Sequence, residues 1–139
     1  MKTLSIRQPW AWLIIRPDII GAEARSAAIK SGEIKTIENR PRRCLKRERI
    51  FIHASAGMTR AEYADTADWL QETFGTTFNL PAFEKLERGG IVGSADITDC
   101  IEESCNHWFG GPFGWVLANA RPEPFKPCKG ALNFFEVEA

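Results

Sequence analysis

The second half of the chain constrains the fold most, because three β-type segments follow one another there with no helix between them. These segments span residues 90–98, 114–119 and 132–137, with turn-forming residues at 110–112 and 122–127. A parallel strand pair needs a crossover of roughly a dozen residues or more, usually a helix. The pattern therefore disfavours a parallel α/β fold.

The first half of the chain alternates predicted strands with predicted helices. Strands are expected over residues 3–6, 36–40 and 50–54, and helices over residues 8–15, 22–31 and 59–74. The last helix has the clearest signal, because Thr59 and Glu62 can form a capping box and Gly75 follows its end. We therefore expect an α+β fold, a small mixed β-barrel of five to six strands, closed or nearly closed, with two to three helices packed on it. Residues 1–139 form a single domain in this interpretation.

Composition limits the classes of protein to which the chain can belong. Its 139 residues, 44% of them hydrophobic and 26% charged, suffice to bury a core without disulfides or metal. The N-terminus lacks the order of a signal peptide, and no apolar run approaches the roughly 20 residues needed to span a bilayer. We expect a cytoplasmic protein with reduced cysteines and no membrane association, and a monomer is favoured.

Charge is balanced overall but unevenly distributed. The 18 basic and 18 acidic side chains cancel, so net charge does not indicate a polyanionic partner. Residues 40–49, however, hold six basic side chains against the single acid Glu48. This stretch could follow a nucleic-acid backbone, or it could be an ordinary solvated loop.

The strongest candidate site follows Gly32. Lys35, Glu38 and Arg40 lie within six residues, and Glu38 and Arg40 share one face of the predicted strand. A dehydrated lysine can act as nucleophile or base, and an arginine fork suits phosphate or carboxylate. Lys35 joins the other two only if the chain bends before residue 36. The alternative is an exposed ion-pair cluster of little energetic consequence.

A second candidate group opens the first predicted helix. Arg7 and Gln8 lie at a strand-to-helix junction, where free backbone N–H groups favour anions. Trp10 offers a flat face on which a base could stack, whereas Trp12, beside Leu13 and Ile14, is expected in the core.

Three further residues complete the predicted ligand contacts. His53 and Ser55 end the strand at residues 50–54, where polar side chains often emerge at a barrel rim. Trp115 follows a Gly-Pro turn and could either stack against a ligand or plug the barrel. No metal is expected, because the gaps between Cys100, Cys105, His107 and Cys128 do not fit a zinc site. No cofactor is expected either, since no glycine-rich phosphate loop is present.

Taken together, these motifs resemble the ASCH family of the PUA-like superfamily, in the manner of a small bacterial or phage-type stand-alone member. The matching segments, in chain order, are Leu4-Ser5-Ile6-Arg7-Gln8-Pro9-Trp10-Ala11, Lys35 with Glu38-Asn39-Arg40, Ile52-His53-Ala54-Ser55, Ile91-Val92-Gly93, Gly111-Pro112 with Gly114-Trp115-Val116-Leu117, and Lys129-Gly130. The resemblance implies a β-barrel with a cleft between barrel and helices that is suited to RNA or a nucleotide derivative.

The resemblance also implies candidate activities. One small bacterial relative is an amidohydrolase that deacylates N4-acetylcytidine with a lysine nucleophile, and Lys35 matches that lysine. Glu38 stands where that enzyme has a threonine, and the third residue of its site, a later glutamate, has no secure match. Another relative has been described as a ribonuclease, for which Lys35 and His53 would be the candidates.

Four functions are therefore compared below. The first is binding of RNA or a modified nucleoside or nucleotide, through Arg7, Gln8, Trp10, Asn39, Arg40, His53, Ser55 and Trp115. The second is an amidohydrolase with Lys35 and Glu38 as catalytic residues. A ribonuclease and a purely structural or protein-interaction domain are the remaining alternatives.

Overall fold

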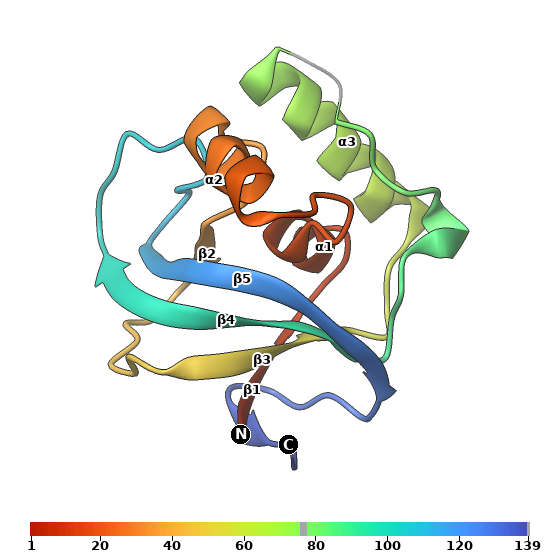
Figure 1. Ribbon diagram of the computed structural model, residues 1–139, viewed down its shortest axis with the longest axis vertical. Coiled ribbons are helices and arrows are strands. Elements are labelled where there is room, and N and C mark those ends of the chain that lie inside the picture. The colour runs from red at the N-terminus through yellow and green to blue at the C-terminus, as the bar shows by residue number, and fades with distance from the viewer. Residues whose placement is uncertain (76–77, 139) are drawn as a thin grey trace.

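One six-stranded sheet and three helices make up the computed structural model, which describes residues 1–75 and 78–138 (Figure 1). The strands are β1 (Lys2–Ile6), β2 (Ile37–Arg40), β3 (Arg49–Ala54), β4 (Gly90–Ile101), β5 (Phe113–Pro127) and β6 (Phe135–Glu136). The helices are α1 (Trp10–Ile15), α2 (Ala22–Ser31) and α3 (Arg60–Phe74), with a short 3₁₀ turn at Phe83–Lys85. The predicted α+β class is thus confirmed.

The strand order in the sheet is β2-β5-β4-β3-β1-β6. Strands β2, β5, β4 and β3 pair antiparallel in that order, and β6 pairs antiparallel with β1. Only β1 and β3 are parallel in this sheet, and the connection between them contains α1, α2 and β2. All three helices lie on the same side of the sheet in Figure 1. The chain termini meet at the opposite side, where the Met1 amine donates to the Val137 carbonyl at 2.7 Å.

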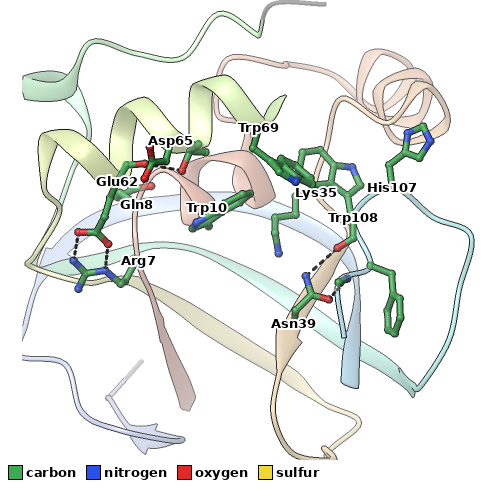
Figure 2. Close-up of a pocket in the computed structure, with 13 residues that line it drawn as sticks. Arg7, Gln8, Trp10, Lys35, Asn39, Glu62, Asp65, Trp69, His107 and Trp108 are labelled. Carbon is green, nitrogen blue, oxygen red and sulfur yellow. Dashed lines mark hydrogen bonds and ion pairs between the residues drawn. The ribbon is translucent and has the colours of Figure 1, made fainter. Parts of the chain in front are cut away.

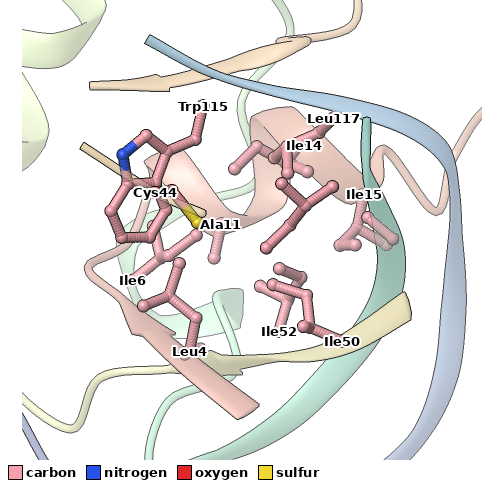
Figure 3. Packing of buried hydrophobic residues seen from close by; sticks show 13 residues of the cluster. Leu4, Ile6, Ala11, Ile14, Ile15, Cys44, Ile50, Ile52, Trp115 and Leu117 are labelled. Carbon is pink, nitrogen blue, oxygen red and sulfur yellow. The ribbon is translucent and has the colours of Figure 1, made fainter. Parts of the chain in front are cut away.

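The main core lies between α1 and the concave face of the sheet (Figure 3). Ile14 of α1 and Ile50 and Ile52 of β3 are completely buried. Burial of one such side chain stabilises the fold by about 1.5–3 kcal/mol. A second apolar cluster lies among the helices and includes Trp12, which the sequence placed in the core, and Trp108. This second cluster holds α3 above α1.

The helix ends follow the predicted signals. Thr59 caps α3, with its hydroxyl accepting from the Glu62 N–H while the Glu62 carboxylate accepts from the Thr59 N–H. Gly32 and Gly75, directly after α2 and α3, adopt φ values of +85° and +67°, which only glycine adopts without strain. The predicted first helix begins two residues late, because Pro9 is the N-cap of α1 rather than part of its first turn.

Two strand predictions are wrong. Residues 122–127 were expected to form a turn but continue β5, and residues 132–137 form a strand only at Phe135–Glu136. Strand β5 tolerates Pro122 and Pro127 because β2 pairs with it only as far as Val116, which leaves the rest of one edge free. Within the described ranges, no helix combines the length and hydropathy needed to cross a membrane.

Candidate ligand-binding site

Lys35, Glu38 and Arg40 form one ion-pair cluster. The Lys35 amine lies 3.2 Å from one carboxylate oxygen of Glu38, and Nε of Arg40 donates to the other at 2.9 Å. The bend that this arrangement needs comes from the segment before β2, where the Lys35 N–H donates to the Leu13 carbonyl at the end of α1. The side chains of Lys35 and Glu38 are only 4% and 11% exposed. The cluster is therefore buried rather than an ordinary surface ion pair.

Burial dominates the electrostatics of Lys35. Loss of hydration lowers the pKa of its amine, and the nearby charge of Arg40 lowers it further. The charge and hydrogen bond of Glu38 oppose these effects and favour the protonated amine. The amine also donates to the Ile37 carbonyl. Lys35 is thus a dehydrated lysine whose amine is held in place by a carboxylate, and burial makes it easier to deprotonate than an exposed lysine.

A cavity of about 410 Å³ opens beside this cluster. It is lined by Ser5, Ile6, Arg7, Trp10, Lys35, Glu38, Asn39 and Arg40. Nη2 of Arg40 donates to the Ser5 carbonyl at 3.0 Å, so a side chain from the edge strand β2 reaches β1 near the other edge of the sheet. The cluster, Arg7 and the indole ring of Trp10 therefore line one concavity.

A larger cavity of about 520 Å³ adjoins the first and shares Arg7, Trp10, Lys35 and Asn39 with it (Figure 2). Its walls are mainly aromatic, from Trp10, Trp69 and Trp108. The Trp10 and Trp69 rings meet edge to face at 5.5 Å between centroids, and Trp69 and Trp108 lie 5.6 Å apart. The Lys35 amine is 5.8 Å from the centre of the Trp10 ring. The larger cavity thus combines three indole rings with the cations of Arg7 and Lys35 and the carboxylates of Glu62 and Asp65.

Arg7 and Glu62 connect β1 to the start of α3 at one side of this larger cavity (Figure 2). The guanidinium binds the carboxylate in a bidentate manner, at 2.7 Å from Nε and 2.6 Å from Nη2. Glu62 also accepts from the Thr59 N–H, and these hydrogen bonds lower the pKa of its carboxyl to about 2. The hydrogen bond to Glu62 in turn raises the pKa of Arg7. Capping α3 and positioning Arg7 are thus coupled.

Asn39 organises the aromatic wall. Its amide nitrogen donates to the Trp108 carbonyl at 3.0 Å, and its amide oxygen accepts from the N–H groups of Gly110 and Gly111 at 2.8 and 3.1 Å. The sequence assigned Asn39 to ligand contact. The structure instead shows its side chain occupied in holding residues 108–111 against β2, although it still lines both cavities.

Gln8 and Trp115 are engaged within the fold. The Gln8 side chain accepts from the Trp12 N–H and donates to the Glu87 carbonyl, and the residue is 3% exposed at the edge of the larger cavity. Trp115 is 1% exposed, donates to the Arg42 carbonyl and lines neither cavity. Of the two interpretations of Trp115, plugging the core fits its position.

His53 and Ser55 line neither cavity, although both contact Ser5, which lines the smaller one. His53 is 1% exposed, and its Nε2 lies 2.8 Å from the Cys128 carbonyl. Because that carbonyl can only accept, Nε2 carries the proton and Nδ1 accepts from the Ser5 hydroxyl at 2.9 Å. Ser55 lies 2.9 Å from the same hydroxyl. The structure brings these three side chains together with one another, but it does not bring His53 to Lys35 in a shared cavity.

Several lining residues escaped the sequence analysis. Trp69 lies off the apolar stripe of α3, and an aromatic residue outside such a stripe was the one signal that could have indicated it. Trp108 was hidden in a segment with no periodic pattern. Glu62 was interpreted as a capping residue only, and Asp65 as one acid among several on a helix. Glu62, Asp65 and Trp69 reach the cavity because α3 packs over α1, and Trp108 lies in the segment that Asn39 holds against β2.

Comparison of the chain with protein-family models gave no match. No curated protein matched its sequence either. Among the described residues, no group of three or more His, Cys, Asp or Glu could hold a metal ion, and all four cysteines are free thiols.

Proposed function

We propose that this protein binds a nucleoside or a short nucleotide in the two adjoining cavities, as a PUA-like domain related to the ASCH family. The observation that carries the proposal is the buried cluster of Lys35, Glu38 and Arg40, which lines the smaller cavity, together with the three indole rings that line the adjoining larger one. Flat aromatic walls suit the face of a base, and clustered donors and acceptors suit its edges and its ribose. The combined size of the cavities suits a ligand of that class.

The sheet topology supports the fold part of this proposal. A nearly closed barrel requires that the two edges of the sheet approach each other. Arg40 of β2 bonds to the Ser5 carbonyl of β1, so a side chain spans the gap between the edges in place of a strand ladder. The cavity of about 410 Å³ lies at this gap.

Charge pairing favours a small ligand over a long nucleic acid. Three of the six basic side chains in the stretch at residues 40–49 form ion pairs with acids on β4 or in the loop after it. Arg49 lies 3.0 Å from Asp96, and Arg43 lies 3.3 Å from Glu102. Paired cations release few counterions from a phosphate backbone, so they contribute little to affinity for a long strand. Four free thiols fit a reducing compartment such as the cytoplasm.

Titration by tryptophan fluorescence tests the proposal directly. The ligands are the common nucleosides, N4-acetylcytidine, their monophosphates and short RNAs. We expect at least one ligand to bind the wild type, and we expect Trp10→Leu to weaken that binding about tenfold through loss of stacking. Phe125→Leu is the matched control, because Phe125 is 38% exposed on β5 and lines neither cavity. Absence of binding by every ligand, or equal weakening by both substitutions, would refute the proposal.

An amidohydrolase acting on an N-acylated nucleoside is the second candidate. The dehydrated Lys35 amine, with its lowered pKa and its contact to Glu38, favours it. Chromatography of N4-acetylcytidine incubated with wild type and with Lys35→Met tests this candidate. Turnover by the wild type alone is the expected result, and equal product in both samples would exclude Lys35 as the catalytic group. A ribonuclease has no comparable support, because Lys35 and His53 share neither cavity.

A further inference from the structure

The two cavities differ in charge. Three cationic side chains, those of Arg7, Lys35 and Arg40, line the smaller cavity against the single carboxylate of Glu38. The larger cavity shares two of these cations but also contains two carboxylates from α3, so its charges balance. The electrostatic potential is therefore more positive toward β2 than toward α3.

The cations of the smaller cavity also retain free donors. Arg40 uses Nε for a carboxylate and Nη2 for a main-chain carbonyl, and no described residue accepts from its Nη1. Arg7 uses Nε and Nη2 for its ion pair, and its Nη1 likewise has no acceptor in the described ranges. The Lys35 ammonium has three N–H donors, and two groups accept from it, the Ile37 carbonyl and the Glu38 carboxylate. Arg7, Lys35 and Arg40 thus each retain an unused donor, and all three residues line a cavity that contains one carboxylate.

From this asymmetry we propose that the smaller cavity is a subsite for one phosphate group of a mononucleotide whose base lies in the larger cavity. The inference rests on the proposed function and assigns its ligand class. Guanidinium groups are well suited to phosphate, which they bind through short, charge-assisted hydrogen bonds. Hydrogen bonds from Nε and Nη2 already hold the Arg40 guanidinium in place, so little side-chain entropy is lost when a phosphate binds.

The carboxylates of Glu62 and Asp65 disfavour a further phosphate in the larger cavity. Both line the larger cavity from α3, so a chain of two or three phosphates extending from the smaller cavity toward α3 would meet like charge. A monophosphate should therefore bind more tightly than its nucleoside, and further phosphates should add nothing.

Calorimetric titration of nucleosides with their 5′- and 3′-monophosphates and 5′-triphosphates tests this inference. We expect the wild type to bind one monophosphate about tenfold more tightly than the matching nucleoside, as one charge-assisted contact implies. Arg40→Ala should abolish that preference, measured within the variant as the ratio of its affinities for the monophosphate and the nucleoside. The preference should also shrink in high salt, because ions screen partly exposed charges.

Two variants serve as controls. Arg43→Ala removes an arginine of the same stretch whose guanidinium pairs with Glu102 outside both cavities, and it should keep the preference. Arg40→Lys keeps the charge and guards against misfolding of the alanine variant, and it should retain part of the preference. Equal affinity of the wild type for nucleoside and monophosphate would overturn the phosphate subsite but leave the proposed function standing. If neither ligand binds, both the subsite and the proposed function are overturned. A preference for the monophosphate that survives in Arg40→Ala would overturn the subsite alone.

Discussion

The sharpest test of the buried cluster is Glu38→Gln, because the cost of this substitution should depend on pH. The substitution leaves the amine of Lys35, whose side chain is 4% exposed, without its counter-charge. Removal of one partner from a buried ion pair costs about 3–5 kcal/mol. Glu38 is 11% exposed and glutamine retains one acceptor, so we expect a loss of about 3 kcal/mol in the free energy of unfolding at neutral pH.

The sign of the pH dependence follows from Lys35. Its pKa in the folded state lies below the ordinary value of 10.5, so the unfolded state binds more protons between the folded pKa and 10.5. Stability therefore rises with pH through that window. Glu38 opposes the lowering, so its removal extends the window downward, and the deficit of the variant should shrink as pH rises toward 10.5.

Urea denaturation at about pH 7 and about pH 9.5 measures this effect in wild type, Glu38→Gln and Glu38→Gln/Lys35→Met. The double variant has no buried charge to strand and should recover much of the lost stability. A deficit below about 0.5 kcal/mol, or one that is equal at both pH values, would contradict a buried Lys35–Glu38 pair.

Three further predictions concern the residues around the cavities. The Glu62 carboxyl should titrate near pH 2 by NMR, so its contribution to stability is lost as pH falls from 4.5 toward 2. Arg7→Gln should return the pKa of Glu62 toward 4.5, and an unchanged pKa would contradict the bidentate pair. His53→Ala should lower the free energy of unfolding by about 2 kcal/mol in chemical denaturation, because it strands the Cys128 carbonyl and removes one of the two side-chain hydrogen bonds of the Ser5 hydroxyl. A neutral effect would show that this network is dispensable. Asn39→Ala removes three hydrogen bonds to residues 108–111 and should accelerate amide exchange there by about tenfold or more, with exchange in α3 unchanged. If residues 108–111 exchange at the same rate in the variant and the wild type, Asn39 does not hold the segment.

The cluster of Lys35, Glu38 and Arg40 was predictable as a set of residues but not as a site. Residue parity placed Glu38 and Arg40 on one face of a strand, and the structure confirms that both bond to each other. The position of Lys35 depended on a bend, and that bend comes from a hydrogen bond to Leu13 of α1, a contact remote in sequence. Burial of the cluster distinguishes it from a common surface ion-pair pattern and makes it a candidate site. Residue spacing in the sequence could not predict that burial.

The tryptophans show the same division. Trp12 was correctly expected in the core because its neighbours are apolar, and it is 8% exposed. Trp69 and Trp108 could not be assigned to the cavity, because one lies on α3 and the other lies between β4 and β5. Likewise, the prolines of residues 122–127 predicted a turn, and only the free edge of β5 explains why they continue a strand.

The sequence by itself determined what is local: the capping box at Thr59, the helix stops at Gly32 and Gly75, the strand-rich second half, and the chemistry of the Lys35 cluster. Each depends on groups a few residues apart, whose geometry the backbone sets directly. The tertiary structure alone decided which side chains share a cavity, which indoles are exposed to it, and which charges lose water. Those properties depend on how α3 packs over α1 and how far β2 approaches β1, and such long-range contacts leave no periodic trace in the sequence.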